Sequence, residues 1–415
     1  MAPTEPTRRA VLASGVAGLT SLGGCLGRSS ADPVPPGSDY PMDRYSPGRA
    51  ARVENALTPP ESLAASWSLS VPATSTPPPS IHDGRAYVND WEGTLFALDA
   101  TEGTTEWSAS LGDDRAGGTR PTVDDSGIYT ATRYGLFAHD HDGTQRWHAE
   151  DVSSARGSPI ISDGTVYITY VSTVKAFDAA SGDLRWSRKP GEAYGSGNVT
   201  LNRTLAVADD TVYAVRERGG YDVPDVFALD AADGDELWHA GTNLVYHRPA
   251  VTPGGDLVTV GQRQVEPDDP DEHIDAWDVV VRWSDDGTPA WRTELDGYRT
   301  YTQPAVDGER VYAPTTEGIE AVSLSDGDPL WQVGDGLTGA PVVAGDHVWV
   351  RVGDTSDGEL RVYTRNGEAV ATYGDVRARP AVTANAVYLV RPASAIETLL
   401  GDTSEIVALV PTSGA

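Results

Sequence analysis

The chain has 415 residues and a formal net charge of −30, from 61 acidic and 31 basic side chains. This length is enough for one large repeat domain or for two or three ordinary domains. The acidic balance argues against non-specific nucleic-acid binding, because phosphate contacts need clustered positive charge. With 44 glycines, 29 prolines and 39% hydrophobic residues, the composition favours many short strands joined by turns.

The acidic, lysine-poor composition carries information about the solvent around the protein. Only Lys175 and Lys189 are lysines, so almost every basic side chain is an arginine. An acidic, lysine-poor surface stays solvated because its carboxylates repel one another. We interpret this as adaptation to high salt, as in halophilic archaea; an ordinary acidic protein from a GC-rich genome is the alternative. Neither interpretation identifies an activity.

The N-terminus has the features of an export signal. Arg8 and Arg9 precede residues 10–24, a stretch of small and apolar residues. The stretch is too short and too rich in glycine for a helix that stays in a bilayer, which needs about 20 apolar residues. It predicts a cleavable signal peptide, and the paired arginines resemble those of the Tat pathway, which carries folded cargo.

A lipid anchor is predicted at the end of this signal. The run Leu22-Gly23-Gly24-Cys25 resembles a lipobox, in which the thiol of the cysteine is lipidated. Cys25 is the single cysteine of the sequence, so no disulfide competes for it. We therefore expect residues 1–25 to be a Tat-type signal with a lipobox, and the chain to be exported and anchored at the outer face of the cytoplasmic membrane.

The next segment, residues 26–60, is rich in proline, serine and glycine. Such a composition predicts an extended chain without a core of its own. We expect it to be a flexible tether between the anchor and a folded domain at 61–415.

Internal repeats occupy that domain. A unit has a leading proline, which only the fourth unit lacks, then a turn, a Val-Tyr type strand, an Ala-Leu-Asp type strand, a glycine turn and a strand with tryptophan. The glycine and the tryptophan are four residues apart in six copies. The tryptophans expected to dock one blade on the next are Trp67, Trp107, Trp147, Trp186, Trp238, Trp291 and Trp331. A seventh copy has Ala371 four residues after Gly367.

Four short strands per repeat predict one antiparallel blade, and successive blades stack around a channel. The last unit ends near Gly414 without its tryptophan strand, whereas the N-terminal segment around Trp67 has such a strand and no unit of its own. We therefore predict an all-β, eight-bladed β-propeller closed by an N-terminal strand, which leaves no open edge. A seven-bladed ring with one degenerate unit is the alternative.

The repeats resemble a known family. The segments at 97–107, 176–186 and 228–238 fit an A-x-D-x-x-x-G-x-x-x-W pattern. This pattern is similar to that of pyrroloquinoline-quinone-like (PQQ-like) propeller repeats, and it covers most of residues 67–414. The resemblance implies one of two branches: quinone-dependent alcohol and sugar dehydrogenases, or non-catalytic scaffolds similar to the BamB lipoproteins.

The dehydrogenase branch would imply PQQ with calcium, an adjacent cysteine pair beside the quinone, and a catalytic aspartate. The single cysteine of this chain leaves no such pair. No calcium-binding set can be aligned residue by residue, so we expect no catalytic residue, no metal and no cofactor. His139-Asp140-His141 lies on a predicted hairpin turn, and the acidic run 266–272 lacks the spacing of a calcium loop. Both are expected to be solvated turns.

Several arginines stand near the leading prolines. Arg120, Arg248 and Arg379 directly precede one, and Arg156 lies three residues before another. At the mouth of a channel these guanidinium groups could converge on a small anion. The alternative is that each pairs with an aspartate of a blade and stabilises the ring.

We expect a non-catalytic scaffold at the cell surface, a monomer that binds protein partners through its loops. The insertions at 217–225 and 262–278 are the first candidates for those contacts. A PQQ-dependent dehydrogenase and an anion-binding channel are the alternatives.

Overall fold

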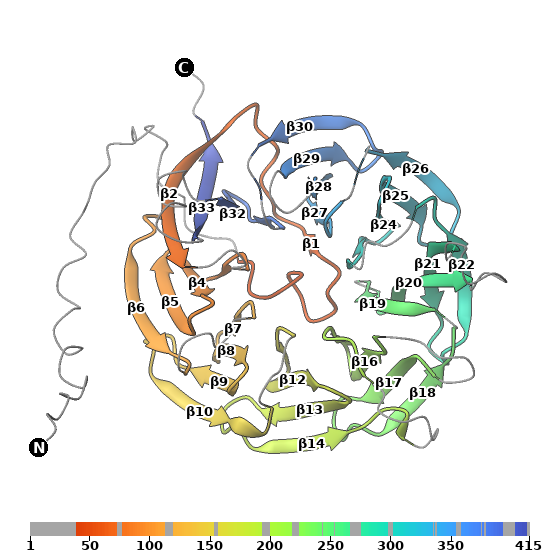
Figure 1. The fold of residues 1–415 in the computed structure, drawn as a ribbon, viewed down its shortest axis with the longest axis horizontal. Helices are drawn as coiled ribbons and strands as arrows, with labels where there is room; N and C mark the ends of the chain where they lie inside the picture. Colours follow the sequence, from red (N-terminus) through yellow and green to blue (C-terminus); the bar gives the residue numbers. More distant parts are fainter. Residues whose placement is uncertain are drawn as a thin grey trace, which may run out of the picture. The chain divides into compact units, whose positions relative to one another are not determined.

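The computed structural model describes residues 39–72, 77–112, 119–152, 157–192, 200–217, 224–242, 244–252, 254–265, 275–297, 302–334, 336, 338–353, 358–374, 376, 379–392 and 403–412. The strands of this part form eight sheets arranged as a ring (Figure 1). The prediction of an all-β, eight-bladed propeller is confirmed, and the seven-bladed alternative is wrong. The signal residues Arg8 and Arg9, the anchor Cys25 and residues 26–38 lie outside the described part.

Four blades make up the first half of the ring. Blade 1 contains β3 (Ser80–His82), β4 (Arg85–Asn89), β5 (Thr94–Asp99) and β6 (Thr105–Ser110). Blade 2 contains β7 (Thr122–Asp124), β8 (Gly127–Thr132), β9 (Gly135–His139) and β10 (Gln145–Ala149), followed by the 3-10 turn η1 (Glu150–Val152). Blade 3 contains β11 (Ile160–Ser162), β12 (Thr165–Tyr170), β13 (Thr173–Asp178) and β14 (Leu184–Arg188). Blade 4 contains β15 (Ala206–Ala208), β16 (Thr211–Val215), β17 (Val226–Asp230) and β18 (Glu236–Ala240).

The other four blades complete the ring. Blade 5 contains β19 (Val245–Val251), β20 (Leu257–Val265), β21 (Asp275–Trp283) and β22 (Pro289–Glu294). Blade 6 contains β23 (Ala305–Val306), β24 (Arg310–Thr315), β25 (Gly318–Ser323) and β26 (Pro329–Val333). Blade 7 contains β27 (Val342–Ala344), β28 (His347–Val352), β29 (Glu359–Thr364) and β30 (Ala369–Tyr373), with β1 (Arg52–Val53) parallel to β27. Blade 8 contains β31 (Ala381–Val382), β32 (Val387–Pro392), β33 (Thr403–Pro411) and β2 (Leu63–Pro72).

The burial of each strand follows its place in the blade. The two middle strands are apolar on both faces, and in blade 2 every residue of β8 and β9 is buried. Each blade lies between two neighbours, so neither face of its middle strands meets water. The outermost strands alternate exposed and half-buried residues, as β6 does. The first strands are short and lie nearest the axis, where adjacent blades approach one another (Figure 1).

The spacing of glycine and tryptophan has a direct structural meaning. In every blade except blade 7, the indole of the outermost strand packs on the glycine turn of the next blade, so that a Cβ on Gly103 would lie 2.5 Å from the ring of Trp67. The same holds for Trp186 against Gly234. Six of these indoles donate Nε1–H to a backbone carbonyl of the next blade at 2.8 to 3.0 Å. Glycine is needed for its positive φ and for its missing side chain.

Two alanine substitutions separate these two reasons. Gly84 and Gly234 have φ values of 73° and 76°, but a Cβ on Gly84 would meet no atom within 4 Å, whereas one on Gly234 would lie 2.6 Å from the Trp186 ring. Gly84→Ala should cost about 1 kcal/mol of unfolding free energy, for the left-handed backbone alone. Gly234→Ala should cost about 2 kcal/mol more, because the indole must move. Urea unfolding of both variants tests this, and equal losses would contradict it.

Blade 7 replaces its missing tryptophan from another strand. Ala371 on β30 leaves room at the boundary with blade 8, and Trp349 of β28 fills it, fully buried in the cluster that contains Tyr388. The Trp349 ring stacks on Tyr373 with centroids 6.0 Å apart. The regular packing therefore continues through the degenerate repeat.

The ring is closed by the N-terminal strand. β2 pairs antiparallel with β33 from Leu63 opposite Pro411 to Pro72 opposite Thr403. Trp67 lies opposite Ala408 in blade 8, and its Nε1 donates to the carbonyl of Ala100 in blade 1 at 2.8 Å. One strand therefore completes the last blade and docks it on the first.

The prediction of a flexible tether over residues 26–60 is wrong for its described part. Tyr40, Met42, Arg44, Arg49 and Ala51 are each at most 5% exposed. Residues 39–57 cross the centre of the ring, where Figure 1 shows them as the orange trace inside the blades. The proline and glycine that suggested a tether serve here to turn the chain within the channel.

Candidate functional site

The central channel holds a segment of the chain itself, residues 39–57, which we call the plug. Its backbone exchanges hydrogen bonds with seven of the eight innermost strands or the turns that follow them. The plug partners, in chain order, are Tyr40 with Ile81, Pro41 with Val123, Pro47 with Val207, Gly48 with Val251, Ala50 with Val306, Ala51 with Val343, Val53 with Gly345 and Leu57 with Thr383. Blade 3 is reached by a side chain, because Arg49 Nη2 donates to the carbonyl of Ser158 at 2.9 Å. All eight blades are thus joined through one segment.

The plug is held in a strained backbone. Arg44, Tyr45, Arg49 and Ala51 have φ values of 66°, 73°, 56° and 55°. A non-glycine residue in this left-handed region costs about 1–2 kcal/mol. Four such residues within one short segment persist because the surrounding ring determines the path of the chain.

An ion cluster surrounds Asp43 at the centre of the plug. One carboxylate oxygen accepts from Arg49 at 2.8 Å, and the other accepts from Arg379 at 2.9 Å. The guanidinium of Arg120 lies over the ring of Tyr40, 4.4 Å from its centroid. The cluster joins three residues of the plug to two arginines that precede the first strands of blades 2 and 8.

Other arginine contacts cover the carbonyl groups at the start of the innermost strands. Arg44 donates to the carbonyls of Pro341, at 2.6 Å, and of Pro304. Arg120 donates to the carbonyl of Pro79 and, at 3.2 Å, to the hydroxyl of Ser80. These carbonyls precede the strands and point to the channel, so the guanidinium groups satisfy acceptors that would otherwise be buried without a partner.

The charges of the cluster depend on one another. Burial opposes ionisation of Asp43, but Arg379, Arg49, Arg120 and Arg44 together outweigh it and hold the pKa of the carboxyl well below its usual range. Burial, with repulsion from Arg379, lowers the pKa of Arg44 to about 9. Burial also lowers the pKa of Arg49 and of Arg120, which Asp43 opposes. The negative charge of Asp43 therefore offsets much of the positive charge of four buried or half-buried arginines.

The predicted anion site is assembled only in part. Arg120 and Arg379 do approach one point, but the carboxylate there is Asp43 of the same chain. Arg248 is half-buried, and its pKa is lowered to about 10 by burial, with Glu217 acting in the opposite direction. Arg156 lies outside the described residues. The aspartate expected from a blade comes from the plug.

The residues that the sequence analysis missed are Tyr40, Asp43, Arg44 and Arg49. A signal was present, because Met42 is the only methionine after Met1, and Tyr40 and Tyr45 flank it. Aromatic and methionine side chains are unusual in a solvated linker, which is poor in large apolar groups. Their grouping between two proline-rich stretches indicates a buried segment.

The remaining candidate clusters are structural where they are described. His139 is 1% exposed rather than solvated, and burial lowers its pKa to about 4. His141 lies 3.0 Å from the hydroxyl of Tyr87 and 3.0 Å from the carbonyl of Asp124. No group of three His, Cys, Asp or Glu residues within the described part has a metal-binding arrangement. The acidic run 266–272 lies outside that part.

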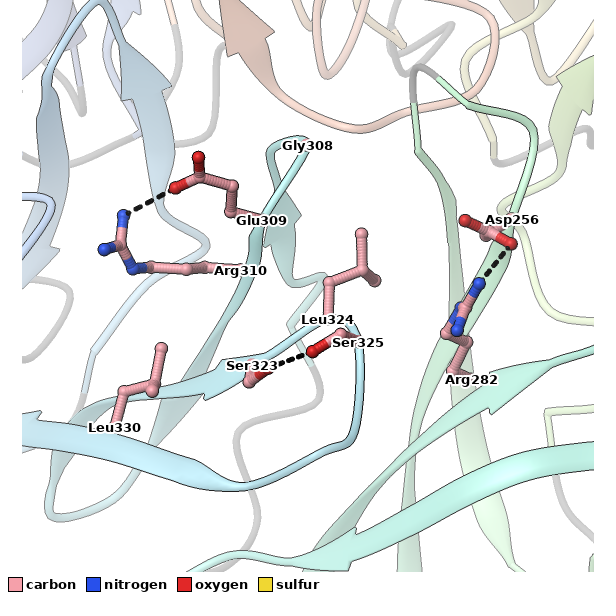
Figure 2. A pocket seen from close by; sticks show the side chains of 9 residues that line it. All are labelled: Asp256, Arg282, Gly308, Glu309, Arg310, Ser323, Leu324, Ser325 and Leu330. Carbon is pink, nitrogen blue, oxygen red and sulfur yellow. Dashed lines mark hydrogen bonds and ion pairs between the residues drawn. The ribbon is translucent and has the colours of Figure 1, made fainter.

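A groove of about 560 Å³ lies between blades 5 and 6 (Figure 2). Its charged groups are already paired, since Arg282 contacts Asp256 at 2.8 Å and Arg310 contacts Glu309 at 3.5 Å. The hydroxyls of Ser323 and Ser325 lie 2.9 Å apart, with no histidine beside them in the lining. The lining therefore has no serine paired with a histidine. Its lining is Asp256, Arg282, Gly308, Glu309, Arg310, Ser323, Leu324, Ser325 and Leu330.

One buried carboxyl outside the channel has an unusual pKa. Glu320 on β25 is 8% exposed, and its Oε1 has no hydrogen-bond partner among the described residues. Burial, followed by repulsion from Asp296 and Asp278, raises the pKa of Glu320 to about 7. Between its ordinary value of 4.5 and about 7 the folded chain binds more protons than the unfolded chain, so stability falls as the pH rises through this window.

Glu320→Gln should remove this decrease in stability with rising pH. We expect the variant to match the original at pH 5 and to be more stable by about 1–3 kcal/mol at pH 8, because no carboxylate then has to ionise between the blades. Guanidinium unfolding at the two pH values measures it, with the exposed Glu317→Gln as the control. An unchanged pH slope in Glu320→Gln would contradict the assignment.

No helix within the described residues is long and apolar enough to cross a membrane. The fold and the channel define an eight-bladed propeller of the PQQ-like type whose centre is filled by its own N-terminal segment. A family model described as "Outer membrane protein assembly factor BamB" matches residues 55–224 and 222–401. The chain belongs to this family.

Individual relatives agree with the family. The chain is 26% identical over 432 residues to BamB of Salmonella typhimurium, a match that covers 88% of this chain and 98% of the relative. It is 34% identical over 147 residues to the serine/threonine-protein kinase AfsK of Streptomyces coelicolor, covering 31% of this chain. The chain spans only 16% of the length of that kinase, so the likeness extends to one part of a larger protein.

Solved structures show the same fold. BamB from Moraxella catarrhalis superposes with a TM-score of 0.60 at 18% identity, covering 84% of this chain and all of that one. The quinohemoprotein alcohol dehydrogenase of Comamonas testosteroni superposes with a TM-score of 0.63 at 14% identity, covering 91% and 82%. Both branches expected from the repeat pattern are therefore among the structural neighbours, and the fold alone does not choose between them.

Proposed function

We propose that the chain is a non-catalytic scaffold that binds protein partners at the cell surface. The observation that carries this proposal is the plug, because residues 39–57 fill the axis of the ring and bond to all of its blades. A rigid ring with a filled centre has its variable surface in the loops at its two faces, which is where recognition usually lies. The BamB relatives, named as assembly factors, support partner binding as the role.

A quinone cofactor does not fit the residues present. The single cysteine gives no adjacent pair, and Arg44 of the plug already donates to the carbonyls of Pro304 and Pro341 in the channel wall. A flat quinone on the axis would have to displace Asp43 and leave several guanidinium groups without their carboxylate.

The anchor and the route of export complete the proposal. Arg8 and Arg9 would direct folded protein through the Tat pathway, and a lipid on Cys25 would retain it at the outer face of the membrane. Thirteen residues, 26–38, then connect the anchor to the first described residue of the ring. Cys25→Ser should release the protein into the medium, whereas Arg8→Lys together with Arg9→Lys should retain it inside the cell.

Chemical cross-linking on intact cells tests the binding role. We expect the same partner in independent experiments, and no reproducible partner would count against a scaffold. The dehydrogenase alternative has one observation in its favour, the fold shared with the Comamonas testosteroni enzyme. Titration with PQQ and Ca²⁺, with dye-linked oxidation of alcohols and sugars as the readout, should give a flat response.

A further inference from the structure

The centre of the plug contains more positive than negative charge. Four guanidinium groups act on the single carboxylate of Asp43, so four positive charges and one negative charge leave a formal charge of +3. In the part of the chain that the structure describes, no second carboxylate forms an ion pair with any of the four. These cations are Arg44, Arg49, Arg120 and Arg379.

This excess of positive charge is buried. Arg44 and Arg49 are each 1% exposed and Arg120 is 4% exposed, so water reaches little of these side chains. Backbone carbonyls accept from all three guanidinium groups, but a carbonyl is neutral and offsets only part of a full charge. A buried cation without a counter-ion is costly, because it has lost its hydration. Burial and repulsion from Arg379 and Arg49 lower the pKa of Arg44 to about 9, which agrees with a shortage of negative charge.

Two donors of these side chains lack an acceptor. The Nε atoms of Arg44 and Arg49 are buried, and neither has a hydrogen-bond partner among the described residues. The terminal nitrogens of both side chains already donate to backbone carbonyls or to Asp43, so the Nε–H groups are what is left. Buried donors in native proteins nearly always have a partner, and an exception indicates a bound water or ion. The net positive charge favours an ion with a negative charge.

Arg379 connects these buried groups with the solvent. Its side chain is 35% exposed, and that of Asp43, which it contacts at 2.9 Å, is 11% exposed. Asp43 in turn contacts Arg49 at 2.8 Å, whose side chain is 1% exposed. The contacts therefore lead from the solvent to a buried point in two steps. So narrow an access favours a monatomic anion over a carboxylate or a phosphate ester.

We propose that the plug binds one halide ion, with chloride as the type, held by Arg44, Arg49 and Arg379 beside Asp43. The ion accepts from the free Nε–H groups and lowers the formal charge of the site from +3 to +2. Two of its three arginines come from the plug, so the site differs from the one expected from the leading prolines alone. The ion fastens the plug to the ring whether or not the loops bind a protein partner.

Urea unfolding at a fixed sodium concentration tests the site, with chloride replaced stepwise by gluconate, an anion too bulky for a buried point. Above the dissociation constant, each tenfold rise in chloride should lower the unfolding equilibrium constant of the original chain about tenfold. Arg44→Met removes one buried cation and its Nε–H, and should lose this dependence. Arg188→Gln removes an arginine whose side chain is 43% exposed, outside the plug, and is the matched control that should respond as the original does.

Two further measurements separate a bound halide from a general effect of salt. Asp43→Asn removes the competing negative charge, so its chloride dependence should begin at a lower concentration than that of the original chain. Crystals of the original chain grown in sodium bromide need no variant. The anomalous scattering of bromide should show one ion in contact with the guanidinium groups of Arg44 and Arg49.

Equal responses of the original chain and Arg44→Met to chloride would overturn the inference. A crystal with water in place of bromide at the two Nε–H groups would overturn it as well. If Arg44→Met does not fold, Arg379→Gln takes its place in the comparison, because the side chain of Arg379 is partly exposed and its loss leaves less of the plug unsupported. Each of these results leaves the scaffold role unaffected, since that role is decided by cross-linking on cells.

Discussion

Asp43→Asn should lower the free energy of unfolding by about 3–5 kcal/mol, the usual cost of removing one member of a buried ion pair. The amide would leave Arg49 and Arg379 without their carboxylate, and Arg44 and Arg120 would lose the nearest negative charge. Guanidinium unfolding measures the loss. The exposed Asp285→Asn is the control and should change stability by less than about 0.5 kcal/mol.

The same cluster predicts a pH dependence. The pKa of Asp43 is depressed in the folded chain, so its stabilising effect is present above the unfolded value of about 4 and is lost as the pH falls below it. The original chain should therefore lose more stability than Asp43→Asn between pH 5 and pH 2. Adding Arg49→Met to Asp43→Asn should recover part of the loss, because one uncompensated cation is removed. A loss below about 1 kcal/mol in Asp43→Asn would mean that water or salt reaches the cluster.

The blades could be predicted from the sequence because their signal is local and repeated. A glycine and a tryptophan four residues apart fix one turn and one docking surface, and each copy supports the others. The closure by Trp67 followed from the same pattern, since one strand was missing at the C-terminus and one was surplus at the N-terminus. Even the degenerate seventh unit kept its place, with Trp349 at the position that a tyrosine occupies in the Val-Tyr type strand of the other units.

The plug could not be predicted by the same means. Its contacts join residues that lie far apart in the sequence, such as Arg44 with Pro341 and Asp43 with Arg379. No period or motif marks these contacts. Proline and glycine occur in solvated linkers and also in buried segments that turn sharply, so their presence does not distinguish the two. Arg120 and Arg379 were expected near the channel because of the leading prolines, but nothing local indicated which anion they meet.

The ring also depends on how its last blade is joined to its first. Among the described strands, β2 forms the longest ladder between the N-terminal segment and the last blade, through its pairing with β33. Trp67 is 7% exposed and contributes to both sides of this junction, because its ring contacts Tyr388 and Gly103 and its Nε1 bonds to Ala100. Loss of β2 would therefore expose the edge of β33 and, at the same time, the surface of blade 1 that Trp67 covers.

Trp67→Ala should therefore destabilise the chain by about 3–5 kcal/mol, the cost of truncating a buried aromatic side chain. Hydrogen exchange should show loss of protection first in the amides of β33, because β2 separates before the interior blades do. Trp91→Ala is the matched control, since Trp91 is 47% exposed and should cost less than about 0.5 kcal/mol. Trp331→Ala removes the same kind of contact between blades 6 and 7. If it exposed the β33 amides as much as Trp67→Ala does, the junction would have no special role, and the ring would unfold as one unit.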